Sequence, residues 1–143
     1  MKKTVLGIAG LTAVAALLTG CGGKAEDKVL TCSKTEEYFG AAATTEYKIT
    51  FDENDMAKHL RIEKNEDLAG SRQYYETDEE YEEGLAFTVD NACAEYEGYT
   101  SCKATRDGAK ITIIVENEIT EQKDEYKLEN VKKTYEEQEL TCK

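Results

Sequence analysis

The sequence predicts an α+β fold, with a single antiparallel β-sheet of about five strands, one main helix packed across it and a short C-terminal helix. Two observations support this. Several short stretches alternate apolar and polar residues, as strands with one buried face do, and one longer stretch repeats apolar residues at spacings of three and four, as a helix does. The order strand, hairpin, helix, hairpin, helix favours one antiparallel sheet with a helix packed across it.

We expect a first strand over residues 29–34, followed by a hairpin. Residues 52–55 are polar and supply the turn of that hairpin. Its two strands are marked by two alternating apolar sets: Tyr47, Ile49 and Phe51, then Met56, Leu60 and Ile62.

The main helix is predicted to begin at Thr77, because Thr77 and Glu80 have the spacing of a capping box. Gly84 weakens the helix interior by about 1 kcal/mol, and Gly98 is a natural terminator. The apolar stripe of this helix consists of Tyr81, Leu85, Val89, Ala92 and Tyr96, with Cys93 in its last turns.

A second hairpin and a short helix complete the domain. A strand over residues 100–106 leads into an Asp107-Gly108 turn, and Gly suits the positive φ that such turns require. The next strand is marked by Ile111, Ile113 and Val115, and a helix is expected over residues 130–138.

The N-terminal segment has the three zones of a secretory signal: Lys2 and Lys3, an apolar run over residues 5–18, and small residues before Cys21. The alternative is an uncleaved single-span anchor, but the run is shorter than the roughly 20 residues that cross a bilayer. We therefore expect residues 1–20 to be a signal peptide.

The sequence Leu18-Thr19-Gly20-Cys21 resembles the lipobox of bacterial lipoproteins. That resemblance implies that the Cys21 thiol receives diacylglycerol and that the chain is cleaved before it. Two acyl chains give stable anchoring, so membrane lipid is the expected partner of Cys21. Residues 21–27 then form the lipidated tether, and the protein lies on the extracytoplasmic face of the cell membrane.

Composition restricts the remaining partners. The signal peptide contains two lysines and no acid, so residues 21–143 carry 16 basic and 30 acidic side chains, a net charge of −14. Such a surface repels nucleic acid and anionic lipid. We expect residues 28–143 to form one α+β domain that is a monomer.

Four cysteines remain after Cys21, and an even number in an exported domain favours disulfides. We expect Cys93–Cys102, which closes a short excursion, and Cys32–Cys142, which joins two similar segments, Leu-Thr-Cys at residues 30–32 and 140–142. Four free thiols are the alternative. A zinc site is disfavoured, because no C-x-x-C pair occurs and His59 is the sole histidine.

The sequence predicts no catalytic residues, no cofactor and no metal site. It has no serine-hydrolase elbow, metalloprotease motif, Walker loop or dinucleotide fingerprint. Residues 52–55 are the best acidic cluster, yet Met56 and Ala57 break the EF-hand pattern, which leaves a polar turn or a loose cation site of another kind.

The function expected from these features is a non-enzymatic binding or accessory module with an unknown protein or small-molecule partner. A small-ligand or cation-binding lipoprotein serving a transporter is the alternative, and a cell-envelope enzyme the third. Tyr74, Tyr75 and Tyr99 lie outside the predicted helix and are the better surface candidates, whereas Tyr81 and Tyr96 belong to its core stripe.

Finally, the chain resembles YehR-like lipoproteins of low-GC Gram-positive bacteria. The features that carry the resemblance are residues 30–35 soon after the lipobox, a strand over 47–51 before an acidic turn, and the closing Leu140-Thr141-Cys142-Lys143. It implies a compact α+β domain and a Cys32–Cys142 bridge, and those lipoproteins have no established enzymatic activity or ligand that could be carried over.

Overall fold

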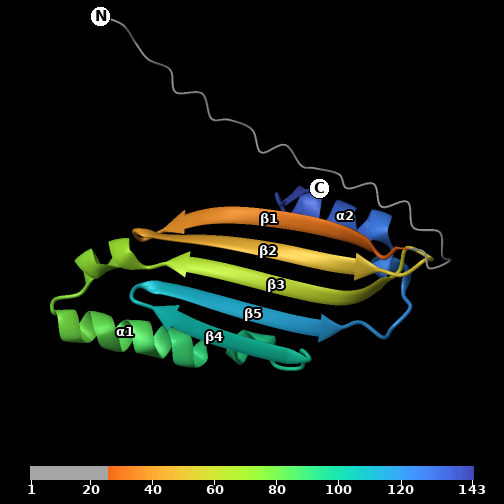
Figure 1. Ribbon diagram of the computed structural model, residues 1–143. Coiled ribbons are helices and arrows are strands. Elements are labelled where there is room, and N and C mark those ends of the chain that lie inside the picture. The colour runs from red at the N-terminus through yellow and green to blue at the C-terminus, as the bar shows by residue number, and fades with distance from the viewer. Residues whose placement is uncertain (1–25) are drawn as a thin grey trace, which may run out of the picture.

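The structure is a computed structural model that describes residues 26–143 (Figure 1). The predicted signal peptide, the predicted lipidation site Cys21 and most of the predicted tether lie outside the described residues. Within residues 26–143, no helix is both long enough and apolar enough to span a membrane.

The domain is built on one antiparallel sheet of six strands in the order β4-β5-β3-β2-β1-β6. The additional strand is β6, a two-residue segment in which Cys142 pairs with Cys32 of β1. The strands are β1 (Lys28–Tyr38), β2 (Ala41–Phe51), β3 (Ala57–Asp67), β4 (Ser101–Asp107), β5 (Lys110–Glu118) and β6 (Thr141–Cys142).

The first two strands are longer than the sequence pattern indicated, and they form a hairpin with each other that was not predicted. β1 continues to Tyr38 and β2 starts at Ala41, so the two strands pair over eleven residues each. The outer halves of these strands consist mostly of alanine, threonine and charged residues, which give little period-two apolar signal. The turn is therefore Phe39-Gly40, which the sequence did not suggest.

Two other boundaries also differ from expectation. Asp107 pairs with Lys110, so the second hairpin turns at Gly108 and Ala109, one residue later than expected. Met56 precedes β3 because the pairing register shifts between Thr50 and Phe51, and its backbone bridges to Lys127 instead.

Two α-helices and three short 3₁₀ helices complete the domain. The capping box is confirmed, since the Thr77 hydroxyl accepts a hydrogen bond from the Glu80 N–H and the Glu80 side chain accepts one from the Thr77 N–H. The main helix ends before Cys93 and Tyr96, which follow it in a 3₁₀ turn. The helices are α1 (Asp78–Asn91), α2 (Leu128–Glu137), η1 (Ala69–Tyr74), η2 (Ala94–Tyr96) and η3 (Asp124–Tyr126).

The helices divide the core into two clusters on one face of the sheet. The main helix was predicted to pack across the sheet, but α1 covers only part of it. It lies beside one end of the sheet and α2 beside the other (Figure 1). α2 packs through Val131 on a cluster around Phe51. The end of α1 packs through Val89 and Ala92 on a cluster of Ile62 and the β5 apolar residues. Tyr47 and Leu60 contact both clusters and join them.

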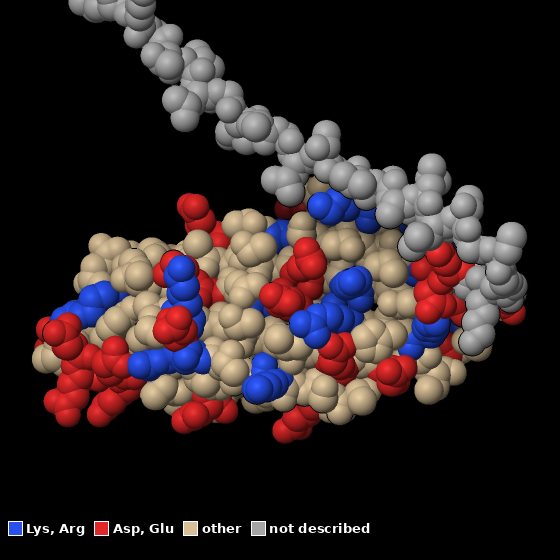
Figure 2. Space-filling model, viewed as in Figure 1, with Lys and Arg blue, Asp and Glu red and all other residues tan. Residues whose placement is uncertain are grey.

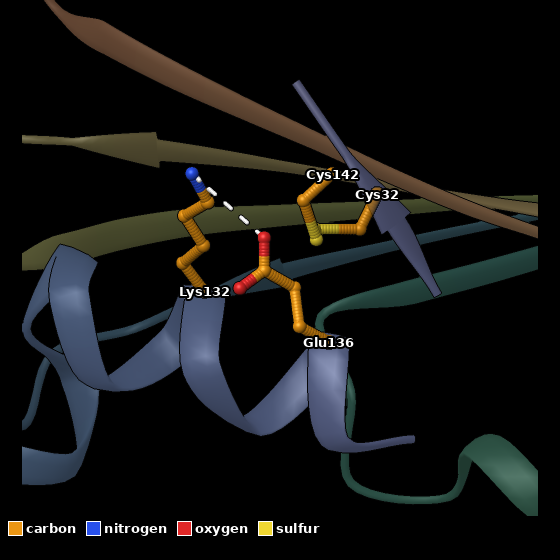
Figure 3. Close-up of a disulfide and its surroundings, with 4 residues drawn as sticks. All are labelled: Cys32, Lys132, Glu136 and Cys142. Atoms are coloured by element: carbon orange, nitrogen blue, oxygen red, sulfur yellow. Dashed lines mark ion pairs between the residues drawn. A yellow bond between two sulfur atoms is a disulfide. The ribbon is translucent and has the colours of Figure 1, made fainter. Parts of the chain in front are cut away.

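The cysteines of the domain form two disulfides in the expected pairing. Cys32 is bonded to Cys142 across the β1–β6 ladder, with Cα atoms 4.0 Å apart. Figure 3 shows this bond beside α2, where Lys132 and Glu136 form an ion pair of 3.8 Å along the helix. Cys93 is bonded to Cys102, which fastens the chain after α1 to β4.

Removing the two disulfides should have unequal effects. The Cys32–Cys142 bond closes a separation of 110 residues and the Cys93–Cys102 bond one of 9. In the loop-entropy model, Cys32→Ala with Cys142→Ala lowers the free energy of unfolding by about 4.8 kcal/mol, and Cys93→Ala with Cys102→Ala by about 2.6 kcal/mol. Denaturant unfolding of each double variant measures the difference, and equal losses would contradict this entropic account.

Candidate functional site

The most exposed large aromatic side chains gather at one end of the sheet, where the β1–β2 turn, η1 and α1 meet. Phe39 is 80% exposed, Phe87 69% and Tyr74 62%. Tyr75 lies between them, because it lines both the hollow that contains Phe39 and the hollow that contains Phe87. We call these four residues the aromatic end. Contiguous exposed apolar surface of this kind marks interaction sites in soluble domains.

A contact between two glycines fixes the hairpin tip at this end. A Cβ atom on Gly70 would lie 2.0 Å from the carbonyl oxygen of Gly40, and one on Gly40 would lie 2.6 Å from that of Gly70. Only glycine at both positions lets the β1–β2 turn touch η1 so closely. The contact holds Phe39 edge-on against Tyr74, with ring centroids 6.4 Å apart.

The backbone of Phe39 is strained. Its φ is +46° and that of Gly40 is +73°, so both turn residues are left-handed, as a type I′ hairpin turn requires. Asparagine or glycine normally occupies the first position, because a bulky side chain there costs about 1–2 kcal/mol. Phe39 thus carries a backbone cost and leaves its ring in water, and such outliers concentrate at functional sites.

Gly84 is explained by the same site. A Cβ atom on Gly84 would lie 2.6 Å from the Tyr75 hydroxyl oxygen and 3.0 Å from two carbons of its ring. Tyr75 therefore lies directly against the α1 backbone, and its ring also contacts Tyr81 at a centroid distance of 5.5 Å. The helix tolerates a glycine in its interior because the glycine seats an aromatic ring.

A buried carboxylate supports the aromatic end from beneath. Glu66 is 6% exposed, accepts a hydrogen bond from the Tyr38 hydroxyl at 2.9 Å and forms an ion pair with the Lys64 ammonium at 2.8 Å. Burial, and then the hydrogen bond to Glu66, raise the pKa of Tyr38 to about 12. Tyr38 therefore stays a neutral donor at physiological pH and fixes the end of β1 next to Phe39.

Acidic side chains surround the exposed rings. α1 carries six acidic residues and no basic one, and Figure 2 shows acidic side chains gathered at this end of the molecule, over α1. Glu76, Glu80 and Glu83 line an open hollow of about 720 Å³ together with Tyr74 and Phe87. The aromatic end is thus an apolar surface with an acidic rim.

A second surface lies at the other end of the sheet, beside α2. A groove of about 460 Å³ runs between the sheet and α2, with Tyr47, Tyr126 and Tyr135 among its walls and Glu125 and Gln138 among its polar residues. We call it the tyrosine groove. Tyr47 and Tyr135 pack with centroids 5.0 Å apart, and burial raises the pKa of Tyr135 to about 12. Burial also raises the pKa of Tyr47.

The polar clusters noted in the sequence have structural partners. His59 lies on the sheet face opposite the helices, with its Nε2 2.8 Å from a buried oxygen of Glu116. In the β2–β3 turn, the Asp52 carboxylate accepts hydrogen bonds from the N–H groups of Asn54 and Met56, and Asp55 pairs with Lys28 at 2.5 Å. Residues 26–143 contain no group of three or more His, Cys, Asp or Glu side chains placed to hold a metal ion.

The sequence identified half of the aromatic end. Tyr74 and Tyr75 belong to it, whereas Tyr99, 38% exposed, lies elsewhere and packs on Tyr96 at 5.6 Å. Phe39 and Phe87 were missed. Phe87 falls two residues after the buried Leu85, which places it on the far side of the helix, so the helical period could have revealed it.

No family model, curated protein or solved structure matches the chain. The similarity to YehR-like lipoproteins therefore stays a prediction from the sequence. Function has to be inferred from the surfaces of the domain itself.

Replacing Phe39 should stabilise the protein. Phe39→Asn puts a residue that tolerates positive φ at the first turn position, so the free energy of unfolding should rise by about 1 kcal/mol. Denaturant unfolding of the full chain measures this. Phe87→Asn is the matched control, because it removes another mostly exposed ring, 69% exposed, from helical backbone and should change stability by no more than about 0.5 kcal/mol. A loss of stability in Phe39→Asn would contradict the strain.

Proposed function

We propose that this chain is a lipid-anchored binding module on the extracytoplasmic face of the cell membrane, and that it holds a protein partner at its aromatic end. The observation that carries the proposal is the exposure of Phe39, Tyr74 and Phe87 together on one surface. Aromatic residues are enriched at protein interfaces and dominate their binding energy. The surface is open and shallow, which suits a protein better than a small molecule.

The position of this surface supports the proposal. The tether meets the domain at the start of β1, where Asp27 pairs with Lys58 at 2.6 Å. The aromatic end lies at the other end of β1, and eleven strand residues span about 35 Å. With Cys21 in the membrane and a tether of a few residues, the aromatic end points away from the lipid, where a partner reaches it.

The proposal includes no catalysis. Among the described residues, His59 pairs with the carboxylates of Glu116 and Glu118, and no hydrogen bond joins it to a hydroxyl or thiol nucleophile that it could activate. The four cysteines of the domain are consumed by disulfides. The third possibility from the sequence, a cell-envelope enzyme, therefore gains no support from His59 or from these cysteines.

Photo-crosslinking on intact cells tests the proposal. The full-length chain, with the photoreactive residue benzoylphenylalanine in place of Phe87, should yield a discrete adduct on irradiation, because position 87 lies within the interface. Adding Phe39→Ser and Tyr74→Ser should remove the adduct, because truncating an aromatic residue at the centre of an interface typically weakens binding by about tenfold or more. Mass analysis of the adduct identifies the partner.

Two controls make this experiment decisive. The same photoreactive residue in place of Lys133, whose side chain is 74% exposed on α2, should yield no such adduct. Cys21→Ala should release the chain from the membrane fraction and so test the anchor separately. The same adduct from both positions, or an adduct that survives Phe39→Ser and Tyr74→Ser, would refute a specific aromatic interface.

The tyrosine groove supports a second candidate function, a small-ligand lipoprotein serving a transporter. Its volume of about 460 Å³ and its mixture of tyrosines with Glu125 and Gln138 fit a compact ligand. This function predicts that one compound in a panel of sugars, peptides and cations raises the thermal midpoint of the full chain, by about 2.7 kcal/mol of stability at a hundredfold over its Kd.

A groove-filling variant checks this second function. Thr134 lines the groove and Lys133 does not. Thr134→Trp should abolish the shift in thermal midpoint by occupying the groove, whereas Lys133→Trp on the same helix should preserve it. A shift that survives Thr134→Trp places the ligand elsewhere, and a panel without any shift argues for the aromatic end alone.

A further inference from the structure

We infer that the partner bound at the aromatic end is a cationic segment of a protein, in which arginine or lysine side chains alternate with apolar ones. This inference rests on the proposed function and names the chemistry of the partner. It comes from the combination of exposed rings with unneutralised carboxylates on one surface. The rings favour apolar side chains of the partner, and the carboxylates favour positively charged side chains next to them.

Some of the acidic side chains next to the rings form no ion pair with the cations of the described residues. Among the acids of α1, Asp78 pairs with Arg72 and Glu82 pairs with Arg106. Within the described residues, no lysine or arginine lies within 4.0 Å of the carboxylates of Glu76 or Glu83, both of which line the hollow beside Phe87. One oxygen of Glu80 is used by the capping box and accepts from the N–H groups of Glu76 and Thr77.

The charge of this rim disfavours the other candidate partners. A second copy of the chain, docked through the same surface, would oppose one acidic rim with another, and like charges across an interface are repelled. An anionic lipid surface or a nucleic acid would be repelled for the same reason. The positive end of the α1 dipole attracts no anion here, because its first turn already carries Asp78, Glu79 and Glu80.

The structure contains an example of the proposed recognition. Arg72 donates to Asp78 at 2.6 Å, and its guanidinium lies 6.0 Å from the ring centroid of Tyr81. A guanidinium is thus held between a carboxylate and an aromatic face at this end of the molecule. A partner arginine placed over Tyr74 or Phe87 and paired with Glu76 or Glu83 would repeat that arrangement.

A pair of peptides tests the inference with the full-length protein in nanodiscs of uncharged lipid. One probe is a short peptide of alternating arginine and leucine, and the other has glutamate in place of each arginine. The arginine peptide should bind at least about tenfold more tightly. Raising the salt from about 0.1 M to about 1 M should weaken that binding severalfold, as the Debye length falls from about 10 Å to about 3 Å. Empty nanodiscs give the background.

Variants separate local from overall charge. Glu76→Gln with Glu83→Gln should weaken binding of the arginine peptide about tenfold, because two nearby carboxylates are lost. Glu129→Gln with Glu136→Gln removes the same net charge from α2 and should leave the affinity unchanged. Phe39→Ser with Phe87→Ser should also weaken binding at least about tenfold.

Each other outcome overturns the inference. Equal binding of the two peptides, or equal losses in the two glutamine pairs, would show that the rim does not select cations. Self-association of the chain through Phe39 and Phe87 at neutral pH would make a second copy the partner. If crosslinking at position 87 succeeds in cells while the arginine peptide fails to bind, the partner class is wrong and the aromatic interface stands. If crosslinking fails as well, the proposed function falls too.

Discussion

The bond between Cys32 and Cys142 is the constraint on which the α2 half of the molecule depends. β6 contains only two residues, Thr141 and Cys142, and beyond them Lys143 exchanges backbone hydrogen bonds with Thr31 of β1. α2 is ten residues long and buries Val131 alone. An isolated helix of that length is marginal in water. The disulfide keeps β6 on the edge of the sheet and thereby keeps α2 over Phe51, so half of the core relies on a covalent bond that joins the two ends of the domain.

The opposite end of the molecule is organised by close contact instead of a covalent bond. Gly40 and Gly70 bring the hairpin tip onto η1, and Gly84 lets Tyr75 lie on the backbone of α1. These three glycines position Phe39, Tyr74 and Tyr75, and the rings of Phe39 and Tyr74 contribute little to the core because they are mostly exposed. Backbone strain and exposed apolar surface therefore both lower the stability of the domain at this end. Such a concession is expected where selection has favoured binding over stability.

The fold class was predictable from the sequence because its signals are local. The capping box of Thr77 and Glu80, the turn glycine at position 108 and the alternation of Ile111, Ile113 and Val115 each depend on neighbouring residues only. The hairpin of β1 and β2 was not predictable in this way. Its outer half is held by backbone pairing to β3 and by the buried Glu66, and neither leaves an apolar period in the sequence.

The same distinction applies to the candidate site. Tyr74 and Tyr75 could be found because they fall outside a predictable helix. Their position next to Phe39, however, depends on the contact between Gly40 and Gly70, which are thirty positions apart in the sequence. No pattern within a short window encodes such a contact. The division of the face between two helices was also hidden. It depends on α1 ending at Asn91, before the last members of its apolar stripe.

The course of β1 has a mechanical consequence. If the chain is anchored at Cys21 and holds its partner at Phe39, then tension between the membrane and the partner enters the domain at Lys28 and leaves it next to Tyr38, the two ends of a single strand. The part of the pull that reaches Phe39 runs along the covalent backbone of that strand, which contributes Leu30 and Cys32 to the cluster around Phe51. The part borne by Tyr74 and Phe87 enters through η1 and α1. The hydrogen bonds of β1 with β2 and β6 hold the strand in place, so a steady load along it leaves the packing of the sheet intact.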